Sequence, residues 1–324
     1  MHPPLMNAYS HCTLCPQLCR VDRLHGEIGI CGESSTVRVA WSGLHRGEEP
    51  PISGEKGSGM IFFSGCPLHC QYCQNRQISG VAPSWEAVPG VEVTIEELSY
   101  MMTGLEAMGA ATINLVTGTH FIPSIIEAIR MARAAGLTGD IVWNSSGFER
   151  VEALRLIDAS IDLYLIDLKT LDPAVSRRFC ATERYARTIE AVMDFIRSRG
   201  VATALNEEGR LRGALVRHLV FPGQQAATRE VLNYYAQQLK ASTWLSLMVQ
   251  FEPPAGDVSF PPITEEEYQG LMDLLDELGI EEGFVQELGE NVSWIPDFTR
   301  DNPFPEGFAE PLEYFLTLRR SSSR

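Results

Sequence analysis

The stretch Gly65-Cys66-Pro67-Leu68-His69-Cys70-Gln71-Tyr72-Cys73-Gln74-Asn75 decides how this chain folds. It places three cysteines at the spacing CxxxCxxC, directly after the apolar run Met60-Ile61-Phe62-Phe63. Thiolates are the protein ligands of iron–sulfur clusters, and three of them can hold three irons of a cubane while the fourth iron stays open. Zinc sites usually take four ligands with their cysteines paired as CxxC, so this spacing fits zinc poorly. We therefore predict a [4Fe–4S] cluster on Cys66, Cys70 and Cys73, with one iron free to bind a second molecule.

The composition is that of an ordinary globular protein, with 324 residues of which 44% are hydrophobic and 21% are charged. The formal net charge of −16 disfavours nucleic acid as a partner, because phosphate contacts need clustered Lys and Arg. No run of residues approaches the apolar length of a membrane span, and the start Met1-His2-Pro3-Pro4 does not begin a signal peptide. We therefore expect a cytoplasmic protein that acts on neither nucleic acid nor membrane.

A second group of cysteines lies before the first, in a region that is rich in turn-forming residues. Its members, at the spacing CxxCxxxC followed by a cysteine after a glycine-containing turn, are Cys12, Cys15, Cys19 and Cys31. A segment with little core of its own is what a metal commonly stabilises, and four thiolates complete a coordination shell. We predict one closed metal centre here, either a structural zinc or iron ion or a second iron–sulfur cluster. The alternative is a set of reduced cysteines packed without metal. Cys180 stands alone, as a packing residue commonly does.

The chain after Gly59 alternates between two patterns. Short, nearly continuously apolar runs predict parallel strands buried on both faces, at Met60–Ser64, Thr112–Thr117, Asp140–Asn144, Ile161–Asp167, Ala214–Phe221 and Trp244–Phe251. Helical patterns follow them at Ile95–Met108, Pro123–Ala135, Arg150–Ala159, Arg184–Arg199, Ala227–Lys240 and Glu265–Leu278. Eight such units close a barrel, so six predict an α/β fold with a partial, open (β/α)6 barrel of the TIM type.

The predicted organisation has three parts. Residues 1–58 form a cysteine-rich N-terminal segment, in which Val37–Trp41 is a short strand and His45–Gly54 is a loop. Residues 59–289 form the barrel. Residues 290–324 form an irregular C-terminal tail that packs on the barrel.

Polar residues follow the predicted strands, at the ends where function gathers in α/β barrels. They are Thr117, Gly118 and Thr119 after the second strand, Asn144 and Ser145 at the third, Asp167 and Lys169 at the fourth, and Arg217 in the fifth. A cation at a barrel mouth is rarely needed for packing, which favours Lys169 and Arg217 as contacts of a ligand. The alternative is that these are ordinary turn residues, with Asp167 and Lys169 forming a structural pair.

The cysteine stretch, with Tyr72 before its third cysteine and Gln74-Asn75 after it, resembles the signature of the radical SAM (S-adenosylmethionine) superfamily. Other stretches resemble its PflX group, named for similarity to pyruvate formate-lyase activating enzyme: Cys15–Arg23, Gly47–Gly54, Gly57–Gln74, Ile113–His120, Asp162–Lys169 and Arg217–Gly223. The resemblance implies a [4Fe–4S] cluster and SAM as cofactors. It also implies reductive cleavage of SAM to a 5′-deoxyadenosyl radical that abstracts hydrogen from a substrate.

The resemblance further implies roles for individual residues. Asn144 and Ser145 fall where the activating enzymes bind a cation beside the SAM carboxylate, although those enzymes have Asp-Thr there. Thr117-Gly118-Thr119 replaces a Gly-Gly-Glu loop that holds the SAM amine in many relatives. Asp167, Lys169 and Arg217 fall among the residues that face SAM and substrate and are our catalytic candidates. Tyr72 is counted with the cofactor-binding residues.

Three functions remain open at this stage. The first is activation of a glycyl-radical enzyme, with flavodoxin or ferredoxin as the electron donor. The second is a radical SAM reaction on a small molecule or a peptide. The third is a non-catalytic iron–sulfur electron carrier, which fits poorly with a three-cysteine site that leaves an iron open.

Overall fold

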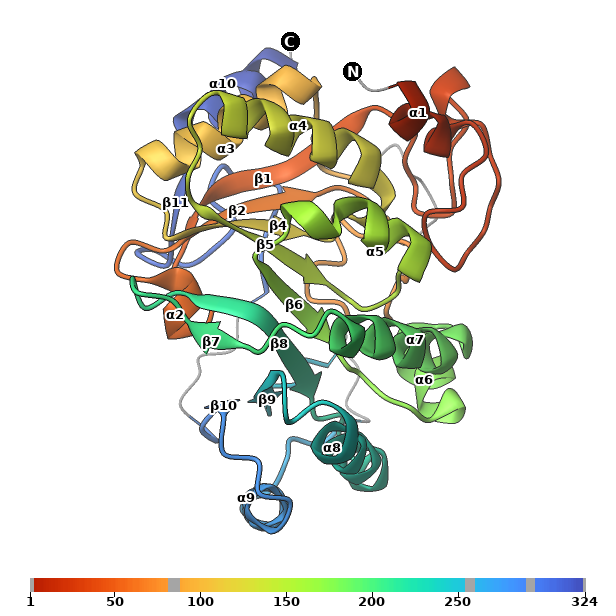
Figure 1. The fold of residues 1–324 in the computed structure, drawn as a ribbon, viewed down its shortest axis with the longest axis vertical. Helices are drawn as coiled ribbons and strands as arrows, with labels where there is room; N and C mark the ends of the chain where they lie inside the picture. The colour runs from red at the N-terminus through yellow and green to blue at the C-terminus, as the bar shows by residue number, and fades with distance from the viewer. Residues whose placement is uncertain (1–2, 81–87, 254–259, 290–294, 323–324) are drawn as a thin grey trace.

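A computed structural model describes residues 3–80, 88–253, 260–289 and 295–322 of the chain (Figure 1). The strands are β1 (Val37–His45), β2 (Ser58–Phe63), β3 (Val91–Val93), β4 (Thr112–Val116), β5 (Asp140–Ser145), β6 (Leu163–Asp167), β7 (Ala204–Leu205), β8 (Leu211–Leu219), β9 (Trp244–Met248), β10 (Gly283–Val285) and β11 (Ala309–Pro311). The helices are α1 (Pro3–Met6), α2 (Pro50–Ser53), α3 (Ile95–Ala107), α4 (Ile122–Ala134), α5 (Val151–Ile157), α6 (Pro173–Cys180), α7 (Arg184–Ser198), α8 (Gln225–Gln238), α9 (Glu265–Glu277) and α10 (Glu313–Ser322).

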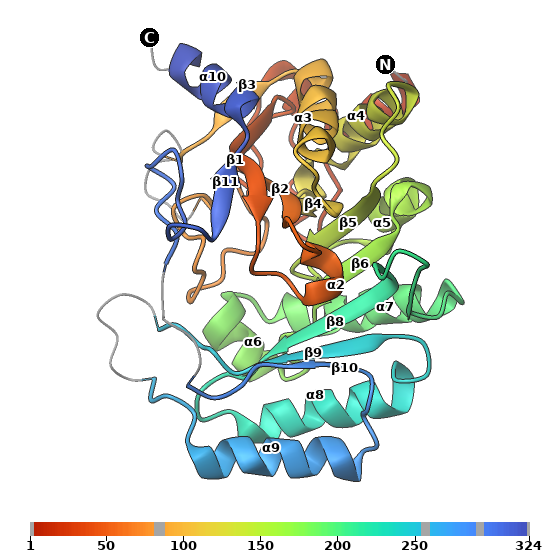
Figure 2. The ribbon, with the colours of Figure 1, turned by 90° about the vertical axis from the view of Figure 1, so that its left-hand side faces the viewer.

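One sheet runs through the molecule in the order β10-β9-β8-β6-β5-β4-β2-β1-β11, and its strands from β10 to β2 are parallel. Helices α3, α4, α5, α7 and α8 follow its outer side, as Figures 1 and 2 show. The six predicted strands and six predicted helices all form, so the fold prediction is confirmed: the sheet is α/β, mostly parallel and open, and does not close into a barrel. Every residue of β2 and β4 is buried, which is why their sequences are mostly apolar, with Ser58, Thr112 and Asn114 as the polar residues.

Local signals in the sequence explain where two of the helices begin. Thr94 accepts a hydrogen bond from the Glu97 backbone, and the Glu97 carboxylate accepts one from the Thr94 backbone. Thr264 and Glu267 make the same reciprocal pair at the start of α9. Each capping box satisfies backbone donors that the first turn of a helix leaves free.

Two predictions outside the main series of strands and helices are wrong. The tail at 290–324 is not irregular throughout, because Ala309–Pro311 forms β11 and Glu313–Ser322 forms α10; residues 290–294 lie outside the described ranges. The predicted loop at His45–Gly54 contains the short helix α2. The strand β1 is longer than predicted and joins the main sheet, antiparallel to β2 on one side and to β11 on the other. The pairing with β11 satisfies backbone N–H and C=O groups that β1 would leave exposed as an edge strand. Because β11 has three residues, its sequence has no periodicity from which this pairing could be predicted. The three-part division of the chain stays a prediction.

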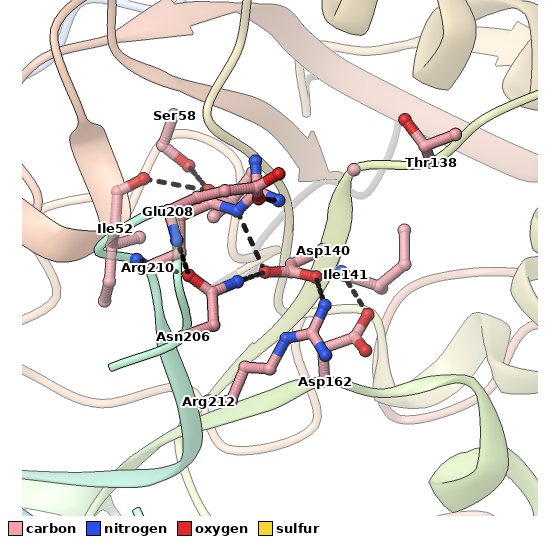
Figure 3. A network of polar contacts seen from close by, with 12 residues as sticks. Ile52, Ser58, Thr138, Asp140, Ile141, Asp162, Asn206, Glu208, Arg210 and Arg212 are labelled. Atoms are coloured by element: carbon pink, nitrogen blue, oxygen red, sulfur yellow. Dashed lines mark hydrogen bonds and ion pairs between the residues drawn. The ribbon is translucent and has the colours of Figure 1, made fainter. Parts of the chain in front are cut away.

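A polar network lies at the amino ends of the strands (Figure 3). The buried carboxylate of Asp140, the first residue of β5, accepts hydrogen bonds from Arg210 Nε at 3.1 Å and Arg212 Nη2 at 2.5 Å. Asn206 Nδ2 contributes a third contact at 3.4 Å. These contacts attach the β7–β8 hairpin to the start of β5. In α/β folds this end of the sheet serves stability, whereas the opposite end carries function.

No helix in the described part of the chain is long and apolar enough to span a membrane.

Candidate active site

A cavity of 360 Å³ lies at the carboxyl ends of the parallel strands. Its wall is built by side chains from β2, β4, β5, β6, β8 and β9 and by the cysteine loop, which we define as Gly65–Asn75. The sequence-predicted residues in that wall are Cys66, Cys70, Tyr72, Cys73, Thr117, Asn144, Ser145, Asp167, Lys169 and Arg217. Residues from six separate strands therefore meet where the parallel topology brings the strand ends together.

Gly118 and Thr119 do not line the cavity. A Cβ on Gly118 would meet Ile125 at 2.6 Å and Trp143 at 3.2 Å, so this glycine allows close packing beneath the site. Thr119 is buried and donates its hydroxyl hydrogen to Glu149 at 2.9 Å. These two positions pack beneath the site in this structure, and their role in cofactor binding stays a prediction.

The cysteine loop leaves β2 through a glycine that no other residue can replace without strain. Gly65 has φ +80°, and a Cβ there would lie 2.5 Å from the Cys31 carbonyl oxygen. Burial raises the pKa of Cys66 to about 11 and that of Cys73 to about 12. The neighbouring Cys180 thiol and burial together raise the pKa of Cys70 well above its ordinary value. The free thiols therefore hold their protons, and a bound metal must displace them.

The donor set of the loop fits an iron–sulfur cluster, because all three side chains are thiols and all three line the same cavity. Within the described ranges, no three His, Cys, Asp or Glu side chains converge closely enough to hold a single metal ion. A cubane attaches each cysteine to a different iron, so its ligands stand farther apart than those of one ion.

Lys169 and Asp167 form an ion pair in the cavity wall, with Nζ 2.5 Å from Oδ2. Burial alone would lower the pKa of Lys169, but the Asp167 carboxylate together with Cys70, Tyr185 and Cys180 raises that pKa well above the ordinary value. Tyr185 fixes the backbone of the pair, because its hydroxyl donates to the Asp167 carbonyl at 2.6 Å and accepts from the Lys169 N–H at 3.0 Å. The predicted structural pair thus lies within the cavity itself.

Arg217 lines the cavity, and its guanidinium is held there by two carboxylates. Its Nε donates to Glu49 at 2.9 Å and its Nη2 donates to Glu48 at 2.7 Å. A second Nη2 contact reaches the other Glu49 oxygen. Although burial raises the pKa of Glu49, the guanidinium outweighs that effect and lowers it. Neither glutamate was predicted as a site residue, because both lie in a stretch that is typical of a loop and 168 or more residues from their partner.

Tyr72 closes the cavity on one side with its ring. The ring packs against Phe221 at 5.0 Å and Phe251 at 5.5 Å between centroids, and Lys169 Nζ lies 5.6 Å from its centre. Burial raises the pKa of Tyr72 well above its ordinary value, so the phenol stays neutral.

Glu149 is a buried residue near the site, and no sequence motif marks it. One carboxylate oxygen accepts hydrogen bonds from Thr119 at 2.9 Å, from Trp143 Nε1 at 3.3 Å and from the Ser145 hydroxyl. Burial raises its pKa, and these hydrogen bonds oppose that rise in part. Glu149 therefore fixes the orientation of Ser145, which lines the cavity.

The N-terminal cysteines gather in one place away from the cavity. Cys12, Cys15 and Cys31 are buried, and the Sγ atoms of Cys31 and Cys19 lie 3.3 and 3.4 Å from the position that a Cβ on Gly29 would take. Burial raises the pKa of Cys15 to about 12 and that of Cys31 to about 11.

Arg23 and the cysteine loop both border this group. Arg23 is fully buried, with Nη1 3.7 Å from the Cys12 Sγ and 2.6 Å from the His120 carbonyl oxygen. The Cys66 N–H donates to the Cys31 carbonyl at 3.1 Å. The His69 ring bonds the Ile30 carbonyl oxygen at 2.8 Å. The two groups of cysteines are therefore joined through the backbone.

Comparison with known families decides what kind of protein carries this site. The sequence profile described as "Radical SAM superfamily" matches residues 60–231, which is more than half of the chain. This chain belongs to the radical SAM superfamily. The superfamily implies an enzyme with a [4Fe–4S] cluster and bound SAM, as the cysteine loop predicts.

Individual relatives are distant. An uncharacterised protein of Methanocaldococcus jannaschii is 23% identical over 282 residues, which cover 85% of this chain and 77% of that protein. Among solved structures, methylornithine synthase matches with a TM-score of 0.49 and 11% identity over 80% of this chain and 79% of its own. Streptococcus suis SuiB matches with a TM-score of 0.48 and 10% identity over 70% of this chain. A domain of pyruvate-formate lyase-activating enzyme from Bacteroides vulgatus matches with a TM-score of 0.37 and 14% identity, over 51% of this chain and 91% of that domain. The chain spans about half the length of SuiB, at 48%.

Proposed function

We propose that this protein cleaves SAM reductively and uses the 5′-deoxyadenosyl radical to abstract a hydrogen atom from a substrate in the strand-end cavity. Cys66, Cys70 and Cys73 hold the [4Fe–4S] cluster. The observation that carries the proposal is that these three thiols line the same cavity as the strand-end residues Asn144 and Lys169. When bound, the cluster supplies the electron that breaks the sulfonium–C5′ bond of SAM and an open iron for its amino acid portion.

The remaining wall residues bind and orient. Asp167 and Lys169 offer a carboxylate and an ammonium from one rigid pair, which suits the hydroxyls and the carboxylate of SAM. Thr117 has φ +58°, a strained conformation for a non-glycine residue, and it turns the chain directly at the cavity wall. Tyr72 and the aromatic rings packed against it make this part of the wall apolar, which favours the exclusion of water there. Such exclusion protects a radical from side reactions.

A second metal centre on Cys12, Cys15, Cys19 and Cys31 is part of this proposal. The four cysteines gather near Gly29 and Arg23, which supports it. Because no three of their side chains converge on a single ion in the described structure, an iron–sulfur cluster, which binds each thiolate at a different iron, fits this arrangement better than zinc. Its contact with Cys66 through the Cys31 carbonyl gives it a direct way to hold the cysteine loop in place.

For the physiological role we propose an activating-enzyme-like reaction in the cytoplasm. The substrate is then the glycine loop of a glycyl-radical enzyme, and flavodoxin or ferredoxin supplies the electron. The sequence resemblance to the PflX group supports this choice. Modification of a small molecule or a peptide is the second candidate, because a cavity of 360 Å³ also accommodates a compact substrate.

The test is anaerobic incubation of reconstituted protein with SAM, dithionite and deuterated candidate substrates. We expect 5′-deoxyadenosine and methionine in equal amounts, with deuterium in the 5′-deoxyadenosine when the correct substrate is present. A protein that carries its cluster but forms no 5′-deoxyadenosine would refute the proposal and favour the electron carrier.

A further inference from the structure

One part of the cavity wall carries more negative than positive charge. Arg217 is shared by two carboxylates, Glu48 and Glu49, whose side chains are 8% and 9% exposed. One guanidinium neutralises one of them, so this triad keeps a net charge of about −1 beside the cavity. Of the two glutamates, Glu48 lines the cavity together with Arg217.

The groups around the triad do not balance this charge. His45 Nδ1 lies 3.8 Å from a Glu48 oxygen, but burial lowers the pKa of His45, so the ring is neutral at pH 7. Lys169 is committed to Asp167 by the ion pair described above. Glu252, which also lines the cavity, adds a further carboxylate.

A buried acceptor without a partner lies beside Glu48. The Asn114 side-chain amide contacts a Glu48 oxygen at 3.5 Å, and within the described structure the Oδ1 atom of Asn114 has no hydrogen-bond partner although the residue is 0% exposed. Asn114 does not line the cavity, so its amide supports the Glu48 carboxylate from behind and leaves the cavity side of that carboxylate for a cationic group.

Aromatic side chains border the same carboxylate. The His45 ring packs edge-on against Phe304 and Phe308, with centroids 4.7 and 4.9 Å apart, and all three residues line the cavity with Glu48. A carboxylate next to aromatic rings is the usual protein environment for an organic ammonium, because the ring faces attract cations and tolerate alkyl groups. Phe304 and Phe308 come from the C-terminal region, so residues from both ends of the chain form this pocket.

We propose that the substrate carries an alkylammonium group, which Glu48 binds against Phe304 and Phe308 in the strand-end cavity. This inference rests on the proposed function in that it takes the cavity as the place where the substrate reacts. It adds the chemical class of the substrate and a residue that selects it.

The experiment measures binding to the holoprotein, loaded with cluster and SAM. Titration calorimetry compares three probes of equal length, n-butylammonium, n-butanol and butyrate, with potassium and magnesium chloride as inorganic cations. We expect n-butylammonium to bind at least about tenfold more tightly than the alcohol, and butyrate not to bind. Equal binding of the three organic probes would overturn the inference. Competition by potassium or magnesium at concentrations similar to that of the amine would assign the position to an inorganic cation instead.

Variants assign the effect to Glu48. Glu48→Gln keeps the shape of the side chain and should lower the affinity for n-butylammonium at least about tenfold. Glu48→Asp keeps the charge and should retain part of the affinity. Glu310→Gln is the matched control, because that carboxylate is 60% exposed on β11 and outside the cavity. If Glu48→Gln folds and binds the amine like the parent, Glu48 does not select the substrate. If it does not fold, the Glu48→Asp variant and the probe series still decide the question. Loss of SAM cleavage with intact amine binding would refute only the proposed function.

Discussion

Cys66, Cys70 and Cys73 line the strand-end cavity, whereas Cys12, Cys15, Cys19 and Cys31 lie in a segment that the cavity does not reach. The two groups contact each other through the Cys31 carbonyl and the Cys66 N–H, so they share a local environment and differ in what they face. Three thiols beside open space can leave a metal position for a ligand, and four thiols in a packed segment can complete a shell. If both groups bind metal as we propose, access to the cavity, more than the number of cysteines, separates the reactive centre from the closed one.

The strongest test of this comparison removes one thiol from each group. Cys66→Ala deprives the cavity-facing site of one of three ligands, and we expect 5′-deoxyadenosine formation to fall by at least about 1,000-fold. Cys19→Ala should keep more than about a tenth of the parent rate with dithionite, because Cys19 does not line the cavity. Both rates are measured by mass spectrometry of anaerobic reactions. Equal losses in the two variants would show that the groups do not have separate roles.

Metal analysis tests whether the N-terminal cysteines bind a metal of their own. A variant in which Cys66, Cys70 and Cys73 are all Ala should keep one metal centre per chain, and further replacement of Cys12, Cys15, Cys19 and Cys31 should remove it. Mössbauer spectroscopy and elemental analysis distinguish cubane iron from stoichiometric zinc. We expect loss of the N-terminal metal to lower the melting temperature by about 10 °C, because a bound metal stabilises a segment with little core. A triple variant that binds neither iron nor zinc would contradict the second centre.

The next largest effect on SAM cleavage is expected from removal of the Lys169 charge at the cavity wall. Lys169→Met keeps the apolar stem, but it removes the ammonium and leaves Asp167 unpaired in a half-buried position. We expect SAM cleavage to fall by about 10- to 100-fold, with circular dichroism unchanged. Lys240→Met is the matched control, because that side chain lies at the surface and donates to the Leu278 carbonyl far from the cavity. Parent-like kinetics of Lys169→Met would remove this residue from the site.

The sequence predicted those parts of the molecule that depend on local patterns. A few neighbouring residues are enough to predict the apolar strands, the cysteine loop and the capping boxes at Thr94 and Thr264. The positions of polar residues at the strand ends followed from the topology. The roles of individual site residues remain predictions, because neither the family nor the distant relatives test them.

Contacts between distant segments could not be predicted. Arg217 lines the cavity, and its role as a ligand contact stays a prediction, but its partners Glu48 and Glu49 lie in a distant stretch rich in Pro and Gly. The strand β11 was missed because three residues carry no periodicity, and it forms only because β1 offers a free edge. Such pairings are set by which elements become neighbours in three dimensions, which no single stretch specifies.

The smallest expected effect concerns Glu149, which holds Ser145 at the wall of the cavity without lining it. Burial raises the pKa of Glu149 in the folded chain. The unfolded chain releases its proton near the ordinary carboxyl pKa of about 4.3. In a range of pH that begins there, the folded chain therefore still binds a proton that the unfolded chain has lost. The stability that this proton contributes is complete below that range and is lost as pH rises through the folded-state pKa. Gln has no such proton, and it retains the oxygen that accepts from Thr119, Trp143 and Ser145.

As pH rises from about 4 to about 7, the parent should lose stability that Glu149→Gln keeps. The melting temperature of Glu149→Gln should therefore rise relative to that of the parent, by roughly 2–4 °C for each kcal/mol of unfolding free energy that the parent loses. Differential scanning fluorimetry of both proteins across this range measures the difference, and effects common to both proteins cancel. Glu152→Gln, whose carboxylate is 64% exposed on the same helix α5, should follow the parent curve at every pH. If the curves of the parent and of Glu149→Gln stay parallel, Glu149 is ionised throughout. Its contact with Ser145 is then a charged hydrogen bond already present at low pH, and an ionised carboxylate holds Ser145 at the cavity wall from behind.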